Sequence, residues 1–221
     1  MIKIITGIFL TALTVFAWEA LSWSVLGWHE RSYRQFRDES QMAEIFTSSL
    51  KNSSTQTASG AGVYVMPFRP NDDKQFKQLY AHSDVQKLES EQNSEVRKKA
   101  MEAYEKALAD GPFVYAVIRP GKREISMANN LLLSFFRSLI CAGLLAAMLS
   151  PMMLPYGLRI AFTAAAGLFA GLACDMPMWI WFETPGAMTL VNMLDHFITW
   201  VLGGAVLGLF VGKDVVITKG M

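Results

Sequence analysis

Ionisable side chains occur inside four long apolar segments of this 221-residue chain, where a charge is costly. A charged group in hydrocarbon costs at least about 2.5–3.5 kcal/mol on insertion scales, so such groups turn inward and pair. If each segment is a helix rising about 1.5 Å per residue, these groups all lie roughly 10–15 Å below one membrane surface. We therefore expect one intramembrane polar cluster, formed by Glu19, Arg137, Asp175, Asp195 and His196.

The expected cluster holds three carboxylates and one arginine, an uneven charge count. Three ionised carboxylates would leave a net charge of about −2 in a low dielectric, which is unfavourable. Protonation of a carboxyl, protonation of His196, or a bound cation or polar ligand would each restore the balance. The cluster is therefore a structural network, a proton or cation site, or a polar groove that receives a ligand or a partner.

A copper site is the second chemical hypothesis. Thiolate and thioether sulfur suit Cu(I), and sulfur donors flank Asp175 in the third apolar segment, with His196 expected at the same depth. Most of the 13 methionines are scattered through apolar segments, where methionine is a packing residue. No other cofactor is predicted. The candidate metal ligands are Cys174, Met176, Met178 and His196.

Other catalytic patterns are absent from the sequence. It contains no G-x-S-x-G, P-loop, dinucleotide fingerprint or zinc spacing, so we expect no enzymatic activity. His29 is expected at the membrane interface and His82 in a loop, both outside the cluster. A net charge of +1 gives no general attraction to nucleic acid.

The elements that must position the cluster are four membrane-spanning helices. The chain is 52% hydrophobic and 18% charged, and a span needs roughly 20 apolar residues. The first apolar run is too long for a cleaved signal core, so it is expected to remain as an anchor. The spans are predicted at residues 4–28, 127–150, 156–182 and 188–212, which divides the chain into 1–29, 30–126 and 127–221.

The segment 30–126 holds 29 of the 39 Lys, Arg, Asp and Glu residues and predicts a small α/β domain outside the membrane. Asp38 can cap a first helix, and the capping box of Ser83 and Gln86 precedes a second. Strands are predicted at 62–68 and 113–118, giving the order α-β-α-β. So few elements make a thin core. The apolar face of the first helix comprises Met42, Ile45, Phe46 and Leu50.

Short basic flanks predict the orientation of the spans. Cytoplasmic flanks are enriched in Lys and Arg, and the loop between the third and fourth spans carries only Glu183. Both termini are therefore expected in the cytoplasm and residues 30–126 outside it. The flanking cations on the cytoplasmic side are Lys3, Arg159, Lys213 and Lys219.

Small-xxx-small patterns occur in the last two apolar segments. Such glycines let helix backbones approach closely. They are expected to pack helices within the bundle, or against a second copy or a partner complex. The helix-packing glycines are Gly167, Gly171, Gly204, Gly208 and Gly212.

Several short motifs resemble those of a group of bacterial inner-membrane proteins with no assigned activity. The resemblance spans most of the chain and implies a bacterial inner membrane, but no site residue. It is carried by residues 23–29, Phe36, Asp38-Glu39, residues 62–67, residues 111–113 and residues 118–120.

These patterns favour an integral-membrane accessory or assembly subunit. Its extracytoplasmic domain and glycine-rich helix faces would bind a partner protein or a second copy. The alternative is a small oligomeric transporter or channel that uses the polar cluster for protons or cations. A stoichiometric larger complex would favour the first reading, and a water-accessible cavity at the cluster would favour the second.

Overall fold

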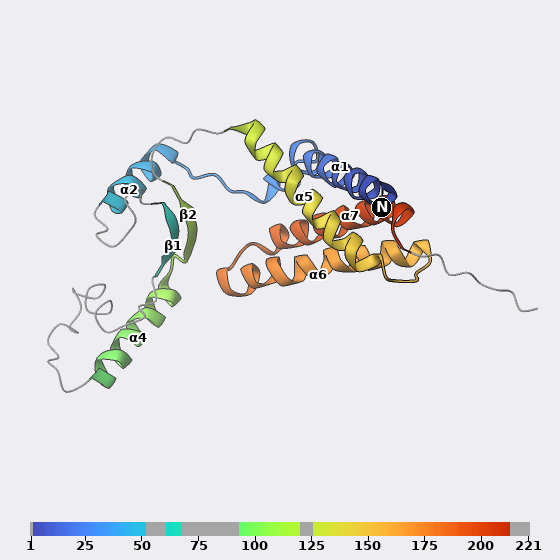
Figure 1. The fold of residues 1–221 in the computed structure, drawn as a ribbon. Helices are drawn as coiled ribbons and strands as arrows, with labels where there is room; N and C mark the ends of the chain where they lie inside the picture. The colour runs from blue at the N-terminus through green and yellow to red at the C-terminus, as the bar shows by residue number, and fades with distance from the viewer. Residues whose placement is uncertain (1, 52–60, 68–92, 120–125, 213–221) are drawn as a thin grey trace, which may run out of the picture. The chain divides into compact units, whose positions relative to one another are not determined.

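The chain forms two compact units, with residues 1–36 and 123–221 in one and residues 37–122 in the other (Figure 1). The computed structural model describes residues 2–51, 61–67, 93–119 and 126–212. It is mostly helical, with four long apolar helices and one small two-stranded sheet. This confirms the predicted fold class at that level. We call the two parts the four-helix unit and the α/β unit.

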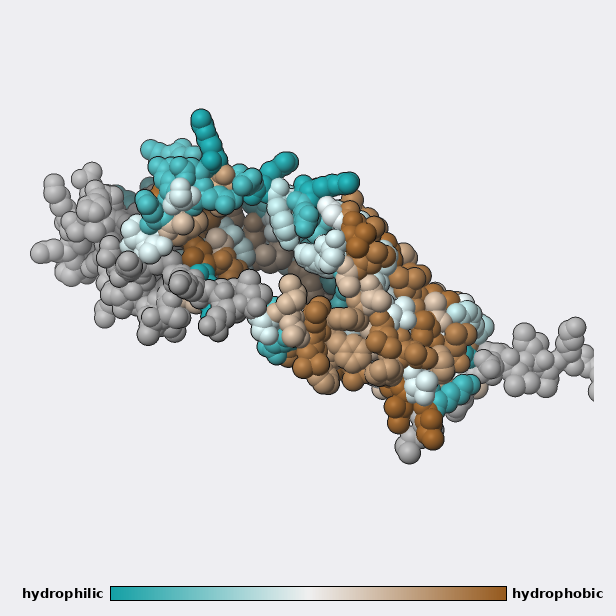
Figure 2. Space-filling view, turned by 90° about the horizontal axis from the view of Figure 1, so that it is seen from above, coloured by the Kyte–Doolittle hydropathy of each residue, from teal (hydrophilic) through white to brown (hydrophobic). Residues whose placement is uncertain are grey.

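The four-helix unit consists of α1 (Ile2–Ser24), α5 (Met127–Leu149), α6 (Tyr156–Phe182) and α7 (Gly186–Phe210). Each helix is long and apolar enough to cross a membrane, and only 22–33% of each apolar window is buried inside the protein. Figure 2 shows predominantly hydrophobic side chains over this unit. Outward-facing apolar side chains on four such helices are typical of a multi-pass membrane protein, as predicted.

The first helix is shorter than the sequence predicts. It ends at Ser24 rather than at residue 28, and Gly27 adopts a φ of 61°. Glycine reaches this left-handed conformation without the steric cost of a Cβ atom. The chain therefore turns after α1, and Trp28 and His29 belong to a separate segment that precedes a short 3₁₀ helix, η1 (Glu30–Ser32).

Glycines bring α6 and α7 into close contact. A Cβ atom on Gly167 would lie 2.5 Å from the backbone oxygen of His196, and one on Gly171 would lie 3.1 Å from the Cα of Met193. A Cβ atom on Gly204 would overlap Thr163 Oγ1. Because only glycine permits this approach, these faces serve contacts within the chain.

A tightly packed apolar core lies at one end of the four-helix unit. Its residues are 0–7% exposed: Leu145, Ala146, Leu149, Leu207 and Val211. Arg159, expected only as a cytoplasmic flank, is 5% exposed beside this core. Its Nε donates to Leu154 O and its Nη1 to Gly208 O, both at 2.8 Å. The guanidinium thus satisfies the Gly208 carbonyl near the C-terminal end of α7, where the helix dipole favours positive charge, and the Leu154 carbonyl before α6.

Gly212 differs from the other predicted packing glycines. It lies two residues beyond the end of α7 and has a φ of +99°. A Cβ atom there would lie 2.6 Å from Arg159 Nε. Because Gly212 has no side chain, the backbone after α7 can pass close to the guanidinium of Arg159. Gly208 packs against the ring of Tyr156, and a Cβ atom on Gly208 would lie 3.2 Å from Tyr156 Cε2.

The α/β unit contains α2 (Glu39–Lys51), β1 (Gly62–Met66), α4 (Asn93–Asp110) and β2 (Val114–Ile118). The strands pair antiparallel, with Gly62 opposite Ile118 and Met66 opposite Val114. The predicted capping box at Ser83 and Gln86 lies outside the described residues. None of the side chains that the structure describes in this unit is fully buried. Two strands alone are marginally stable, so the unit gains little from its own core.

Asp38 begins α2 as an N-cap, as its position before the apolar face predicts. Its Oδ1 accepts the backbone N–H of Gln41 at 2.9 Å and the hydroxyl of Ser40 at 2.6 Å. These hydrogen bonds, that of Gln41 first, hold the pKa of Asp38 below its ordinary value because they stabilise the carboxylate. The cap therefore contributes its full stabilisation at pH values above the ordinary aspartate pKa. This stabilisation is lost as the pH falls through the lowered pKa of Asp38.

Candidate functional site

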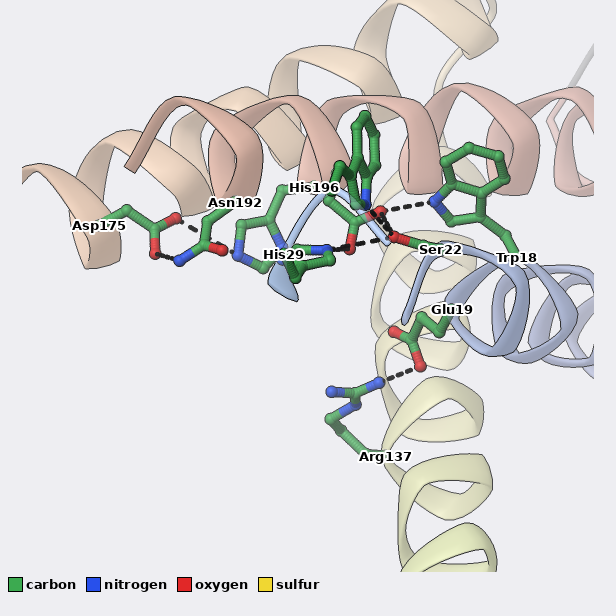
Figure 3. Close-up of polar contacts among 10 residues, drawn as sticks. Trp18, Glu19, Ser22, His29, Arg137, Asp175, Asn192 and His196 are labelled. Atoms are coloured by element: carbon green, nitrogen blue, oxygen red, sulfur yellow. Dashed lines mark hydrogen bonds and ion pairs between the residues drawn. The ribbon is translucent and has the colours of Figure 1, made fainter. Parts of the chain in front are cut away.

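Asp195 on α7 is the centre of a network with α1. Its side chain is buried, and its Oδ1 accepts the indole N–H of Trp18 at 2.8 Å and the hydroxyl of Ser22 at 2.9 Å. Trp18 and Ser22 are four residues apart and so share one helix face. Figure 3 shows both pointing from α1 toward α7. The carboxylate thereby fastens one helix to another within the apolar unit.

The turn after α1 folds over this network. The His29 side chain is 3% exposed, and its Nε2 lies 3.5 Å from Asp195 Oδ2 (Figure 3). Its ring stacks on Trp23 at 3.9 Å with an interplanar angle of 3°, while Trp28 Nε1 donates to Ser22 Oγ at 2.9 Å. His29 therefore lies inside the network, so the expectation that it lies outside is wrong.

An ion pair joins α1 to α5. Arg137 Nη2 donates to Glu19 Oε2, and Figure 3 shows the two side chains pointing toward each other from their helices. The Glu19 carboxylate is also within electrostatic range of Asp195 and His196. The side chain of Glu19 is 23% exposed and that of Arg137 is 58% exposed. The arginine is thus paired but only partly covered by the protein.

Asp175 joins α6 to α7. Its Oδ1 accepts the side-chain N–H of Asn192 at 3.3 Å, and its Oδ2 lies 3.5 Å from His196 Nε2. Asn192 and His196 are one helical turn apart and so share one face of α7. All five residues predicted for the cluster therefore contact a polar partner in this layer, which also includes four that sequence reasoning did not assign: Trp18, Ser22, His29 and Asn192.

Each of the three carboxylates faces one basic side chain. Glu19 pairs with Arg137, Asp195 with His29, and Asp175 with His196. The sequence alone suggested a single cation for the three acids. With both imidazoles protonated the layer is neutral, and with both neutral its formal charge is −2. The net charge of this layer is therefore set by how many of the two imidazoles carry a second proton.

A cavity of about 500 Å³ opens onto this layer. Its polar wall comes from α1, the turn after it, α5 and α7: Glu19, Ser24, His29, Ser134, Arg137, Asn192, Asp195, His196 and Thr199. Apolar side chains, including Phe16 and Trp23, complete the lining. A space of this size with convergent charged groups suits a small polar ligand, water or part of another chain.

The copper hypothesis gains no geometric support from the described residues. Within them, no three His, Cys, Asp or Glu side chains gather as a metal site. Cys174 is exposed, while Asp175 turns to Asn192 and His196 on α7. The thioethers of Met176 and Met178 and the imidazole of His196 therefore stay candidate copper ligands only as a prediction.

Comparisons with known proteins assign no relative to this chain. No protein-family model, curated protein or solved structure matches it.

Proposed function

We propose that this chain is a multi-pass protein of a bacterial inner membrane and acts as an accessory or assembly subunit. Both termini lie in the cytoplasm, and residues 30–126 lie in the periplasm. The partner contacts the periplasmic residues and the surface of α5 around Arg137. The basic flanks support this orientation, and the four apolar helices support the membrane setting.

The observation that carries the proposal is the exposure of Arg137. The residue lies within an apolar helix, yet 58% of its side chain is uncovered by the chain itself. A guanidinium facing hydrocarbon costs at least about 2.5–3.5 kcal/mol, so such a side chain is covered by protein or water. Glu19 contacts one side of it and the cavity borders another, and we assign the remaining exposed surface to a partner helix.

The glycine faces are less suited to the partner than the sequence suggests. Gly167, Gly171 and Gly204 already pack α6 against α7 within the chain. By contrast, the first seven residues of α5, from Met127 to Leu133, are exposed. The partner surface is therefore assigned to α5, where the exposed apolar residues Leu132, Leu133 and Phe136 precede one half-exposed cation.

Photocross-linking in native membranes tests this assignment. Phe136, which adjoins Arg137 and is 50% exposed, and Phe169 on α6, which is 72% exposed, are each replaced by p-benzoylphenylalanine. Because only the α5 face is assigned to the partner, position 136 should give one protein adduct of defined mass that copurifies stoichiometrically. Position 169 should give lipid adducts.

The matched variant adds Arg137→Gln, which removes the charge and keeps a hydrogen-bonding side chain. It should reduce the adduct at position 136 at least several-fold. Equal protein adducts at both positions, or none at either, would contradict the accessory-subunit proposal.

Proton or cation transport is the second candidate, and the cavity favours it. Glu19, Asp195 and His196 line a space large enough for several waters. Passage across the membrane would require another conformation, because the core around Leu149 and Leu207 is fully buried at the other end. This candidate predicts activity of the purified chain in vesicles and no partner adduct at position 136.

A further inference from the structure

The hydrogen bonds of Ser22 define how His29 meets Asp195. A hydroxyl has one proton to donate and two lone pairs to accept. Trp28 Nε1 only donates, so Ser22 Oγ accepts at 2.9 Å. With Asp195 ionised, the single Ser22 proton goes to Asp195 Oδ1 at 2.9 Å. The remaining contact, 3.2 Å from His29 Nε2, therefore requires a proton on Nε2.

The same Nε2–H lies beside the other oxygen of Asp195. The Nε2···Oδ2 distance is 3.5 Å, and both side chains are nearly covered by protein. A second proton, on Nδ1, would make His29 an imidazolium opposite a carboxylate. The stacked ring of Trp23 at 3.9 Å also favours a cation, because an indole face attracts positive charge.

The charged surroundings of His29 come from all three helices around the cavity. Asp195 on α7 is its direct partner, while Glu19 on α1, Arg137 on α5 and His196 on α7 line the same cavity. Glu19 and Arg137 neutralise each other as an ion pair. Glu30 and Arg31, which follow in η1, are exposed and of opposite charge. Asp195 is therefore the main uncompensated charge that His29 faces.

His29, Trp23 and Ser24 also form part of the cavity wall. We infer that residues 25–29 are a proton-held latch, in which protonated His29 holds the turn onto Asp195 and narrows access to the cavity. When His29 loses its second proton, Nε2–H still donates, but the bond is no longer charge-assisted. Charge-assisted hydrogen bonds are roughly twice as strong as neutral ones, so the turn then opens more often.

Cysteine accessibility in phospholipid nanodiscs tests the latch on the full chain without any partner. The two native cysteines are removed by Cys141→Ala and Cys174→Ala. Ser134→Cys then places a thiol in the cavity wall, and a separate Ala43→Cys protein serves as the exposed reference. The ratio of their labelling rates by a charged methanethiosulfonate should rise about fivefold between pH 5.5 and pH 8, the factor that about 1 kcal/mol represents.

Two variants assign the effect to one histidine. His29→Gln keeps a neutral N–H donor, so the ratio should be high and independent of pH. His196→Gln, which removes the other cavity imidazole, should leave the rise intact. A flat ratio in the unmodified histidine background, or a rise that persists in His29→Gln, would overturn the latch.

Nitrogen-15 spectra of labelled histidine give a second measurement in which His29 itself stays unchanged. The chain has three histidines, and His82→Gln and His196→Gln assign their signals. His29 should keep its Nε2 proton throughout and gain an Nδ1 proton as the pH falls. A bare Nε2 in the neutral form would contradict the proposed hydrogen bonding. Both experiments use the purified chain without a partner. A result that contradicts the latch would therefore leave the partner proposal unaffected.

Discussion

Replacing Asp195 with alanine should lower the melting temperature of the protein in detergent by about 10 °C. The substitution removes the shared acceptor of Trp18, Ser22 and His29, and it leaves their polar hydrogens facing an apolar bundle. Breaking a buried charge network by removing one partner costs about 3–5 kcal/mol. For a chain of this size, each kcal/mol shifts the melting temperature by about 2–4 °C. A thermal scan followed by tryptophan fluorescence provides the measurement.

Glu183→Gln is the matched control, because Glu183 is an exposed acid in the same four-helix unit. It should leave the melting temperature within about 2 °C of the parent. Asp195→Asn should fall between the two, since the amide keeps one acceptor oxygen and loses the charge. Equal melting temperatures for Asp195→Ala and Glu183→Gln would show that the hydrogen bonds of Asp195 do not stabilise the fold.

A second large effect is expected at Gly167. In Gly167→Ala the new methyl would lie 2.5 Å from the backbone oxygen of His196 and 2.9 Å from Trp200 Cδ1. A backbone oxygen cannot rotate away, so α6 and α7 must separate. Overpacking of this kind costs about 1–3 kcal/mol. It also displaces the turn of α7 that bears His196 and so weakens the contact between His196 and Asp175. The same thermal scan should show a clear loss of stability.

Gly143→Ala controls for the change of residue type. Gly143 lies inside α5, and a Cβ atom there would meet nothing within 4 Å. Alanine is favoured over glycine in helices by up to about 1 kcal/mol, so this variant should be neutral or stabilising. The two glycine-to-alanine changes should therefore have opposite signs. Equal losses at both positions would mean that close contact between α6 and α7 does not decide the outcome at Gly167.

Periodicity and length predicted the long helices well, because hydrophobic runs of this length have one stable form in a bilayer. The third span was predicted at 156–182, and α6 is Tyr156–Phe182. The fourth was predicted at 188–212 and is observed at Gly186–Phe210. Depth along the helices also indicated which ionisable residues would lie at one level, since the rise per residue is constant.

The turn after α1 was not predictable in the same way. The apolar run continues through Val25 and Leu26, so hydropathy alone extends the helix to Trp28. The structural signal is Gly27 with its positive φ, but a glycine within an apolar run does not by itself end a helix. Once the chain turns there, His29 is carried back over Ser22, and the site gains a base that helical spacing would have placed elsewhere.

Pairing of the charges also lay beyond the sequence. Spacing along the predicted spans placed three acids and one arginine at a similar depth, but it did not predict which acid the arginine contacts. The contacts depend on helix rotation: Glu19 turns to α5, while Trp18 and Ser22 on the same helix turn to α7. Neighbouring positions of a helix point about 100° apart, so one helix serves two partners.

The most direct test of the central claim, that polar side chains of separate spans satisfy one another across the bundle, is a double-mutant cycle on Glu19→Gln and Arg137→Gln. Unfolding free energies of the two single variants, the double variant and the parent would be measured in one lipid–detergent mixture. Because the pair is partly exposed, we expect a coupling energy of about 1 kcal/mol. Glu19→Gln should therefore lower the unfolding free energy more in the parent, where Arg137 loses its partner, than in the Arg137→Gln background. Additive effects within about 0.3 kcal/mol would show that these two side chains do not meet.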